Sequence, residues 1–200
     1  MNYLRPTYWD ELLHCFHTLI YLFWRKTTVK LDDSCVILVM DVINGYSSLY
    51  SKNVMNEINK TIKMGRANKS KIIFTRWVRH FPDNIEDCDE IDKKGHWSFY
   101  VPRSGTDLMI EPAEGDIVID VRHTNAFVHA EFAEQIGKDK TIVFTGAWAE
   151  SCIINTVRHA VDKNMKTIVI KDACAGHSGA FQYSMYVMHS IYTTVFSTVG

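Results

Sequence analysis

The sequence has no surplus of charge of either sign. Its 22 Lys and Arg residues nearly balance 23 Asp and Glu residues, so the formal net charge is −1. A protein that binds DNA, RNA or an anionic membrane surface through electrostatics concentrates positive charge. We therefore expect no nucleic-acid partner. The hydrophobic content of 46% is that of an ordinary globular protein.

Cysteine and glycine motifs are also missing. The five cysteines are an odd number and form no CxxC pair or Cys/His zinc spacing. We expect reduced thiols, as in a cytoplasmic protein. The nine histidines do not form a ligand set, and neither GxGxxG nor GxxxxGK[ST] occurs. The sequence thus predicts neither a bound metal nor another cofactor.

An apolar stretch, LLHCFHTLIYLFW, occupies residues 12–24. It is too short for a membrane span, which needs ~20 apolar residues, and it lacks the cleavage site of a signal peptide. We expect an amphipathic helix in an N-terminal extension, residues 1–30, that covers the sheet or a subunit interface. A membrane-surface anchor is the alternative. So much apolar surface favours a homo-oligomer.

Residues 31–200 have the pattern of one α/β domain. Apolar runs of strand length alternate with helical segments, which indicates a mainly parallel sheet with helices on both faces. We predict a Rossmann-like three-layer αβα sandwich around six strands. The predicted strands are 35–40, 71–77, 116–121, 141–145, 166–171 and 193–197, and the predicted helices are 49–67, 127–136, 150–162 and 177–190.

Three residues lie at the predicted carboxyl ends of strands, where open α/β sheets bind ligands. Asp41 follows a strongly apolar strand, and a buried carboxylate is costly unless it is paired or used; capping the next loop is its alternative role. Cys152 lies in the first turn of a helix, where the positive helix end favours a thiolate and N–H groups can hold an oxyanion. Its alternative role is that of a small buried hydrophobe. Val121 ends the third strand.

Several motifs together resemble the isochorismatase-like, or cysteine hydrolase, family. They are CVILVMDVINGY at 35–46, TGAWAESC at 145–152 and NTVRHAVDKNMKTIVIKDACA at 155–175, and the similarity extends over residues 30–199. The resemblance implies a Cys nucleophile, an Asp base and an assisting Lys, and usually a dimer or larger oligomer. Asp41 and Cys152 match the first two. It also implies a non-proline cis peptide between Ala147 and Trp148, and an oxyanion hole formed by the Trp148 and Cys152 amides.

The sequence departs from the family pattern at two positions. The lysine position falls on Val121 in GDIVIDVRHTNAF, residues 115–127. Valine cannot donate a proton or hold a charge, so Arg122, Arg76 or His123 would have to supply a substitute cation. Where nicotinamidases of the family carry Asp-x-His for a metal, this chain has Trp-Val-Arg at 77–79. The resemblance therefore implies no metal, and nicotinamide becomes an unfavoured substrate.

Aromatic residues near the candidate site suggest a pocket for a flat or cyclic small molecule. Their alternative role is plain core. They are Tyr46, Trp77, Trp97, Phe127 and Trp148.

Two functions remain open. The first is a hydrolase that acts through Asp41 and Cys152 on a small amide-type substrate, or on a vinyl ether with a protonated Asp41 as general acid. The second is a catalytically impaired member of the family that binds a small molecule or a protein as a scaffold. Val121 favours the second function, and the intact Asp41 and Cys152 favour the first.

Overall fold

The computed structural model describes residues 26–79 and 100–200. The helix that we predict within residues 12–24, and Trp97, lie outside the described residues. In the part that is described, no helix is both long and apolar enough to cross a membrane.

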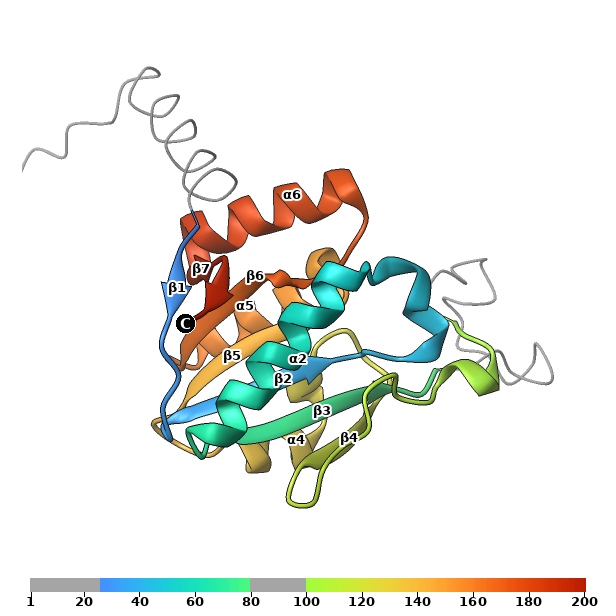
Figure 1. Ribbon diagram of the computed structural model, residues 1–200, viewed down its shortest axis with the longest axis horizontal. Coiled ribbons are helices and arrows are strands. Elements are labelled where there is room, and N and C mark those ends of the chain that lie inside the picture. Colours follow the sequence, from blue (N-terminus) through green and yellow to red (C-terminus); the bar gives the residue numbers. More distant parts are fainter. Residues whose placement is uncertain (1–25, 80–99) are drawn as a thin grey trace, which may run out of the picture.

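A six-stranded sheet forms the centre of the protein (Figure 1). All neighbouring strands are parallel, and their order is β4-β3-β2-β5-β6-β7. This confirms the predicted six-stranded α/β fold. The strands are β2 (Cys35–Met40), β3 (Lys71–Trp77), β4 (Ile117–Val121), β5 (Thr141–Gly146), β6 (Lys166–Cys174) and β7 (Thr194–Phe196).

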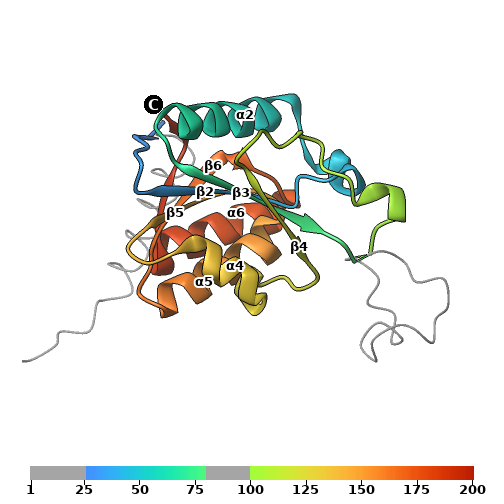
Figure 2. The same cartoon turned by 90° about the horizontal axis from the view of Figure 1, so that it is seen from below.

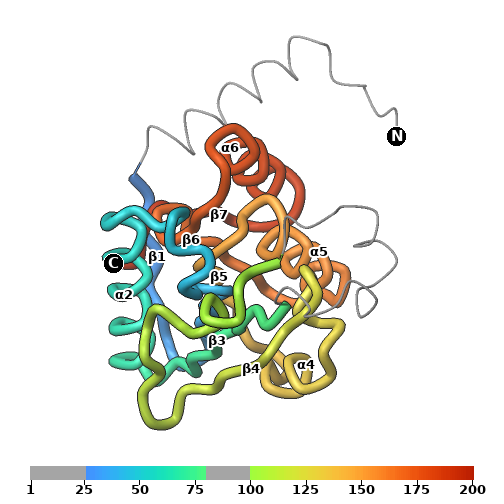
Figure 3. Tube along the Cα trace, turned by 90° about the vertical axis from the view of Figure 1, so that its right-hand side faces the viewer, coloured from blue at the N-terminus to red at the C-terminus, as the bar shows by residue number. Residues whose placement is uncertain are grey.

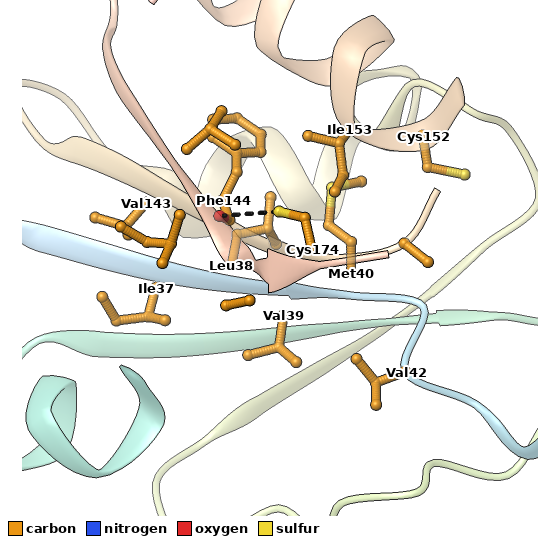
Figure 4. Close-up of a cluster of buried hydrophobic side chains, with 14 of the residues drawn as sticks. Ile37, Leu38, Val39, Met40, Val42, Val143, Phe144, Cys152, Ile153 and Cys174 are labelled. Carbon is orange, nitrogen blue, oxygen red and sulfur yellow. Dashed lines mark hydrogen bonds between the residues drawn. The ribbon is translucent and has the colours of Figure 1, made fainter. Parts of the chain in front are cut away.

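The central position of β2 explains why its sequence does not alternate between apolar and polar residues. It lies between β3 and β5, and all six of its residues are buried. A strand covered on both faces needs apolar side chains on both. Figure 4 shows part of this core: Cys152 lies at one end of the cluster, whereas Cys174 points back to the Phe144 carbonyl oxygen, 3.9 Å from its sulfur.

Helices cover both faces of the sheet, which confirms the three-layer sandwich (Figure 2). One face carries α2, whose buried side includes Ile58, Ile62 and Gly65. In the part of the chain that the structure describes, the other face carries α4, α5 and α6. The bounds are α2 (Lys52–Ala67), α4 (Ala130–Ile136), α5 (Ile154–Asp162) and α6 (Ser178–Val187).

The helix boundaries differ from the prediction at several ends. The helix predicted at 49–67 begins at Lys52, because the Ser51 side chain caps it by accepting the Val54 N–H; the preceding 3-10 helix is Asn44–Leu49. The segment predicted as helix 127–136 divides into a 3-10 turn, Ala126–Val128, and α4. The helices predicted at 150–162 and 177–190 each contain one π-helical turn. Apolar periodicity does not distinguish these helix types.

A second, two-stranded parallel sheet joins β1 (Thr28–Val29) to β8 (Thr198–Val199). Lys60 of α2 donates a hydrogen bond to Thr198 at 2.9 Å, which ties this small sheet to the α2 layer. The sequence did not predict it, since a strand of two residues has no detectable periodicity. β1 falls within the segment that we assign to the extension, residues 1–30.

The strand order reverses between β2 and β5, so their carboxyl ends flank the switch point of the sheet (Figure 3). Gly146 allows these two ends to meet. A Cβ atom at Gly146 would lie 2.1 Å from the Met40 carbonyl oxygen, and the backbone φ angle is +100°. Both the space and the conformation require glycine, which places the turn after β5 directly beside Asp41.

Candidate active site

Asp41 lies directly after β2 and is completely buried. Its backbone adopts the left-handed region, with φ of 53°, which is uncommon for a non-glycine residue and most accessible to Asp and Asn. Its Oδ1 atom accepts a hydrogen bond from the Thr75 hydroxyl at 2.7 Å. Its Oδ2 atom is buried and has no conventional hydrogen-bond partner among the described residues.

Cys152 lies in the π-helical turn Ala149–Ile153 that precedes α5, and it is 2% exposed. The backbone of Trp148 lies close enough to its sulfur to lower the pKa of the thiol, against the larger effect of burial. The thiol also contacts the Asp41 side chain. The structure thus brings together the two residues that the sequence singled out, at the carboxyl edge of the sheet.

Burial dominates the electrostatics of this pair. It raises the pKa of Asp41 to about 7, although the hydrogen bonds from Thr75 and Cys152 oppose the rise. Burial, followed by the Asp41 charge, raises the pKa of Cys152 well above its ordinary value. Two anions side by side are therefore disfavoured, and the pair holds at least one proton at neutral pH.

Two tyrosines surround the pair. The Tyr50 hydroxyl donates a hydrogen bond to the main-chain carbonyl oxygen of Asp41 at 3.2 Å, so it holds the backbone at Asp41 in place. Tyr46 is 5% exposed. Burial raises the pKa of Tyr46 strongly, and the charges of Asp41 and Cys152 add to the rise. Tyr46 therefore lies near both Asp41 and Cys152, and its role in binding a substrate stays a prediction.

Trp148 connects the π-helical turn that carries Cys152 to the surrounding aromatic groups. The Ala147–Trp148 bond is cis, as the family resemblance implies. The Trp148 ring meets the Tyr46 ring edge to face at a centroid distance of 5.3 Å. The His177 ring packs on Trp148 at 4.6 Å. The role of the Trp148 and Cys152 amides as an oxyanion hole stays a prediction.

Val121 ends β4, and it is buried beside Trp77, its partner in the neighbouring strand. Both side chains are 1% exposed. The position at which the family resemblance implies a lysine is thus an apolar position within the core. Trp77 belongs to the same core and stabilises the end of β3.

The three candidate substitutes for the lysine lie elsewhere. Arg76 forms a two-pronged ion pair with Asp120, at 2.7 and 3.0 Å. Arg122 and His123 are exposed near His129. Among the described residues, no cation is one of the groups that shift the pKa of Asp41 or Cys152. The structure therefore does not bring the proposed substitutes to the pair.

Phe127 packs away from the pair. Its ring stacks on His159 at 4.8 Å and meets Phe132 edge to face at 4.9 Å. These contacts place Phe127 in the layer of α4 and α5. Of the described aromatic residues expected at the pocket, Tyr46 and Trp148 are the two whose contacts connect them to Asp41 and Cys152.

Sequence analysis missed four residues of this region: Thr75, Tyr50, Glu150 and His177. Thr75 carried a usable signal, because it is a polar residue near the end of a buried strand adjacent to β2. The other three had none, since their positions depend on how the loops fold. In the described ranges 26–79 and 100–200, no group of three or more His, Cys, Asp or Glu side chains could hold a metal ion.

Comparisons with known proteins agree on one family. The model of the isochorismatase domain matches residues 35–198. N-carbamoylsarcosine amidase from Arthrobacter sp is 28% identical over 95 residues, which are 46% of this chain and 36% of that protein's length. The chain thus matches little more than a third of this curated relative.

Solved structures share the fold. A cysteine hydrolase from Pseudomonas syringae pv. phaseolicola 1448A superposes with a TM-score of 0.68 at 16% identity, over 86% of this chain and 92% of that one. N-carbamoylsarcosine amidase from Thermoplasma acidophilum superposes with a TM-score of 0.61 at 23% identity, over 81% and 95% of the two chains.

Proposed function

Because the chain belongs to the isochorismatase domain family, we propose that it hydrolyses a small amide-type substrate with Cys152 as the nucleophile and Asp41 as the general base. The observation that supports this most directly is the contact between the two side chains in a buried corner of the sheet. A nucleophile beside a base that is itself held by a third group is the arrangement that covalent catalysis needs. Here Thr75 holds the base.

The reaction would proceed in two halves. Asp41 accepts the Cys152 proton while the sulfur attacks the substrate carbonyl, and the Trp148 and Cys152 amides hold the oxyanion. The C–N bond then breaks, and the leaving amine takes the proton from Asp41. Water then attacks the thioester while Asp41 accepts one of its protons. The C–S bond breaks, Asp41 returns the proton to the Cys152 sulfur, and the carboxylic acid leaves. A carboxyl group with a pKa of about 7 both accepts and donates protons near neutral pH.

The vinyl-ether alternative uses the same carboxyl group without a covalent step. Burial raises the Asp41 pKa to about 7, which favours a protonated carboxyl group near neutral pH. A protonated Asp41 would donate its proton to the vinyl carbon of the substrate. Water then adds to the resulting oxocarbenium ion and returns a proton to Asp41, and the adduct breaks its C–O bond to give a carbonyl compound and an alcohol. In this version Cys152 is dispensable, which distinguishes the two mechanisms.

The experiment measures ammonia release from a panel of small carboxamides and carbamoyl compounds, with mass spectrometry for the thioester on Cys152. We expect Cys152→Ser and Asp41→Asn to lower the rate by about a hundredfold or more. Cys174→Ser is the matched control, because Cys174 is also buried but contacts Phe144 instead. Turnover of every active compound by Cys152→Ser at the native rate would reject the covalent mechanism.

A binding scaffold is the second candidate, and two observations favour it. Val121 is apolar, and burial raises the pKa of the Cys152 thiol well above its ordinary value, which keeps thiolate scarce at neutral pH. A scaffold would bind compounds from the same panel without turnover and without thioester formation. Calorimetry on those compounds distinguishes it from the hydrolase.

A further inference from the structure

Glu150 lies within the π-helical turn that carries Cys152, and it forms a second hydrogen-bonded pair with His177. The Oε1 atom of Glu150 accepts from the His177 backbone N–H at 2.8 Å and contacts the ring Nδ1 at 3.1 Å. Two backbone hydrogen bonds join the same two loops, from Ala149 N–H to Ala175 O and from Ala175 N–H to Gly146 O. The pair is thus fixed to the turn that carries Cys152.

The Glu150 carboxylate is an under-satisfied acceptor. Its side chain is 16% exposed, and its Oε2 atom is buried with no hydrogen-bond partner among the described residues. Gly176 makes this placement possible, because a Cβ atom there would lie 2.0 Å from Oε2. Asp41 also has a buried oxygen, Oδ2, without a conventional hydrogen-bond partner among the described residues, although its side chain contacts the Cys152 thiol.

His177 adds an exposed acceptor. A carboxylate only accepts hydrogen bonds, so the ring Nδ1 in contact with Glu150 carries the hydrogen. The neutral ring then offers Nε2 as an acceptor, on a side chain that is 64% exposed. The ring packs on Trp148, whose other contact is Tyr46, so one line of aromatic rings leads from His177 to the Asp41–Cys152 pair.

Neither Arg76 nor the residue at the lysine position supplies a cation to these acceptors. The guanidinium of Arg76 is paired with Asp120, and Val121 presents only methyl groups. Negative and acceptor groups without a compensating cation make a site more favourable for a positive ligand. Aromatic faces beside carboxylates have the same preference, because the ring quadrupole attracts cations.

We infer that Glu150 and His177 are specificity-determining residues, and that they select a small flat substrate bearing a cationic nitrogen group such as an amidinium. Glu150 supplies the charge preference, and His177 Nε2 accepts a hydrogen bond from a substrate N–H. The inference rests on the proposed function in assuming that the substrate enters beside Cys152. It goes further by naming the chemistry of the part of the substrate that does not react.

The test uses three ring compounds of one size and different charge: benzamidine, benzamide and benzoate. Calorimetry on the full chain measures their affinities, and slower alkylation of Cys152 by iodoacetamide locates the bound compound at the site. We expect benzamidine to bind about tenfold more tightly than benzoate, with benzamide between them. Equal or tighter binding of benzoate, or no binding of benzamidine at millimolar concentration, would overturn the inference.

Two variants separate the roles of the residues. Glu150→Gln keeps an acceptor for the His177 N–H and removes the charge, so it should lower the benzamidine-to-benzoate ratio by about threefold or more. Glu134→Gln is the matched control, because it removes one charge from an exposed position of α4. His177→Ala should weaken benzamidine and benzamide alike, since both donate N–H groups, and leave benzoate unchanged.

The outcomes also distinguish this inference from the proposed function. If the protein selects benzamidine but Cys152→Ser retains turnover, the covalent mechanism is refuted and the selectivity is supported. An unchanged ratio in Glu150→Gln, in a protein that forms the Cys152 thioester, would refute the selectivity and leave the mechanism supported.

Discussion

The side chains of Asp41 and Cys152 meet in a corner of the sheet closed to water, and each changes the proton affinity of the other. The Asp41 charge raises the pKa of the thiol, and the thiol hydrogen bond lowers the pKa of the carboxyl group. Such a pair loses its protons as a unit. A nearby positive charge is the change that would favour the doubly ionised form most.

Val121→Lys tests this effect directly. An ammonium group at the end of β4 should favour the thiolate, so we expect the alkylation rate of Cys152 by iodoacetamide at pH 7 to rise about tenfold. Val121→Met, which is similar in length and uncharged, is the control. Equal rates in the native protein and the lysine variant would mean that a different group already compensates the pair.

The stability of the protein should depend on pH through Asp41. Its pKa is about 7 in the folded protein against 3.8 as its ordinary value, so the folded state binds more protons between these values. The free energy of unfolding therefore falls as pH rises through this window. Asp41→Asn should remove the effect. The free energy of unfolding of the variant should therefore rise, relative to that of the native protein, by about 2 to 3 kcal/mol from pH 5 to pH 8.

Urea denaturation of both proteins at the two pH values measures this difference. Asp162→Asn, an exchange at the last residue of α5, provides the control for a general change in charge. A constant difference between the native protein and Asp41→Asn would show that the carboxyl group is ionised at both pH values.

Thr75→Val removes the hydroxyl group that donates to Asp41 Oδ1. Because that hydrogen bond favours the ionised carboxylate, its loss should raise the Asp41 pKa further and shift the pH profile of Cys152 alkylation. We also expect a loss of about 1 to 3 kcal/mol in stability, since a buried acceptor is left without a partner.

Thr145→Val is the matched control for this change. Thr145 is buried in β5, and its hydroxyl group donates to the Leu38 carbonyl oxygen instead. The two variants should lose similar stability, but only Thr75→Val should move the pH profile. A shift in both would indicate a general effect on the sheet.

Gly146→Ala should destabilise the protein severely, by several kcal/mol, because the new Cβ atom would lie 2.1 Å from the Met40 carbonyl oxygen. Gly137 has a positive φ but nothing within 4 Å of an added Cβ atom, and we expect Gly137→Ala to lose about 1 to 3 kcal/mol from backbone strain alone. Chemical denaturation compares the two. Similar losses would mean that the strand ends can separate at little cost.

The prediction of a homo-oligomer remains to be tested. Two large apolar side chains near the end of the chain, Tyr183 and Ile191, are 69% and 67% exposed, and residues 178–192 contain no Asp, Glu, Lys or Arg. Light scattering should give a mass above the 23.1 kDa of one chain, and Ile191→Glu should lower it. A mass near 23.1 kDa for the native protein at high concentration would refute the prediction.

The sequence predicted the strands well because buried parallel strands are continuous apolar runs, as in β2. The proximity of Asp41 and Cys152 could also be predicted, because each lies after such a run and the carboxyl ends of β2 and β5 meet at one edge. Their roles in catalysis stay a prediction. Strand alternation could have excluded Arg76, whose side chain points to the opposite face from its neighbours Thr75 and Trp77.

The rest depended on contacts between distant segments. Phe127 follows β4 closely, but only the folded loop shows that its ring turns to His159. Glu150 and His177 are 27 residues apart, and nothing in their local sequence connects them. Such pairs form through the tertiary fold, which single-sequence periodicity does not contain.

The backbone of Asp41 restricts what can be learned by replacing it. At a φ of 53°, alanine would pay a conformational cost of about 1 kcal/mol in addition to losing the carboxyl group, so a defect in Asp41→Ala would mix geometry with chemistry. Asparagine tolerates the same conformation and keeps the shape of the side chain. Position 41 therefore has two requirements: a residue that tolerates a positive φ, and a carboxyl group that can exchange a proton. Aspartate meets both.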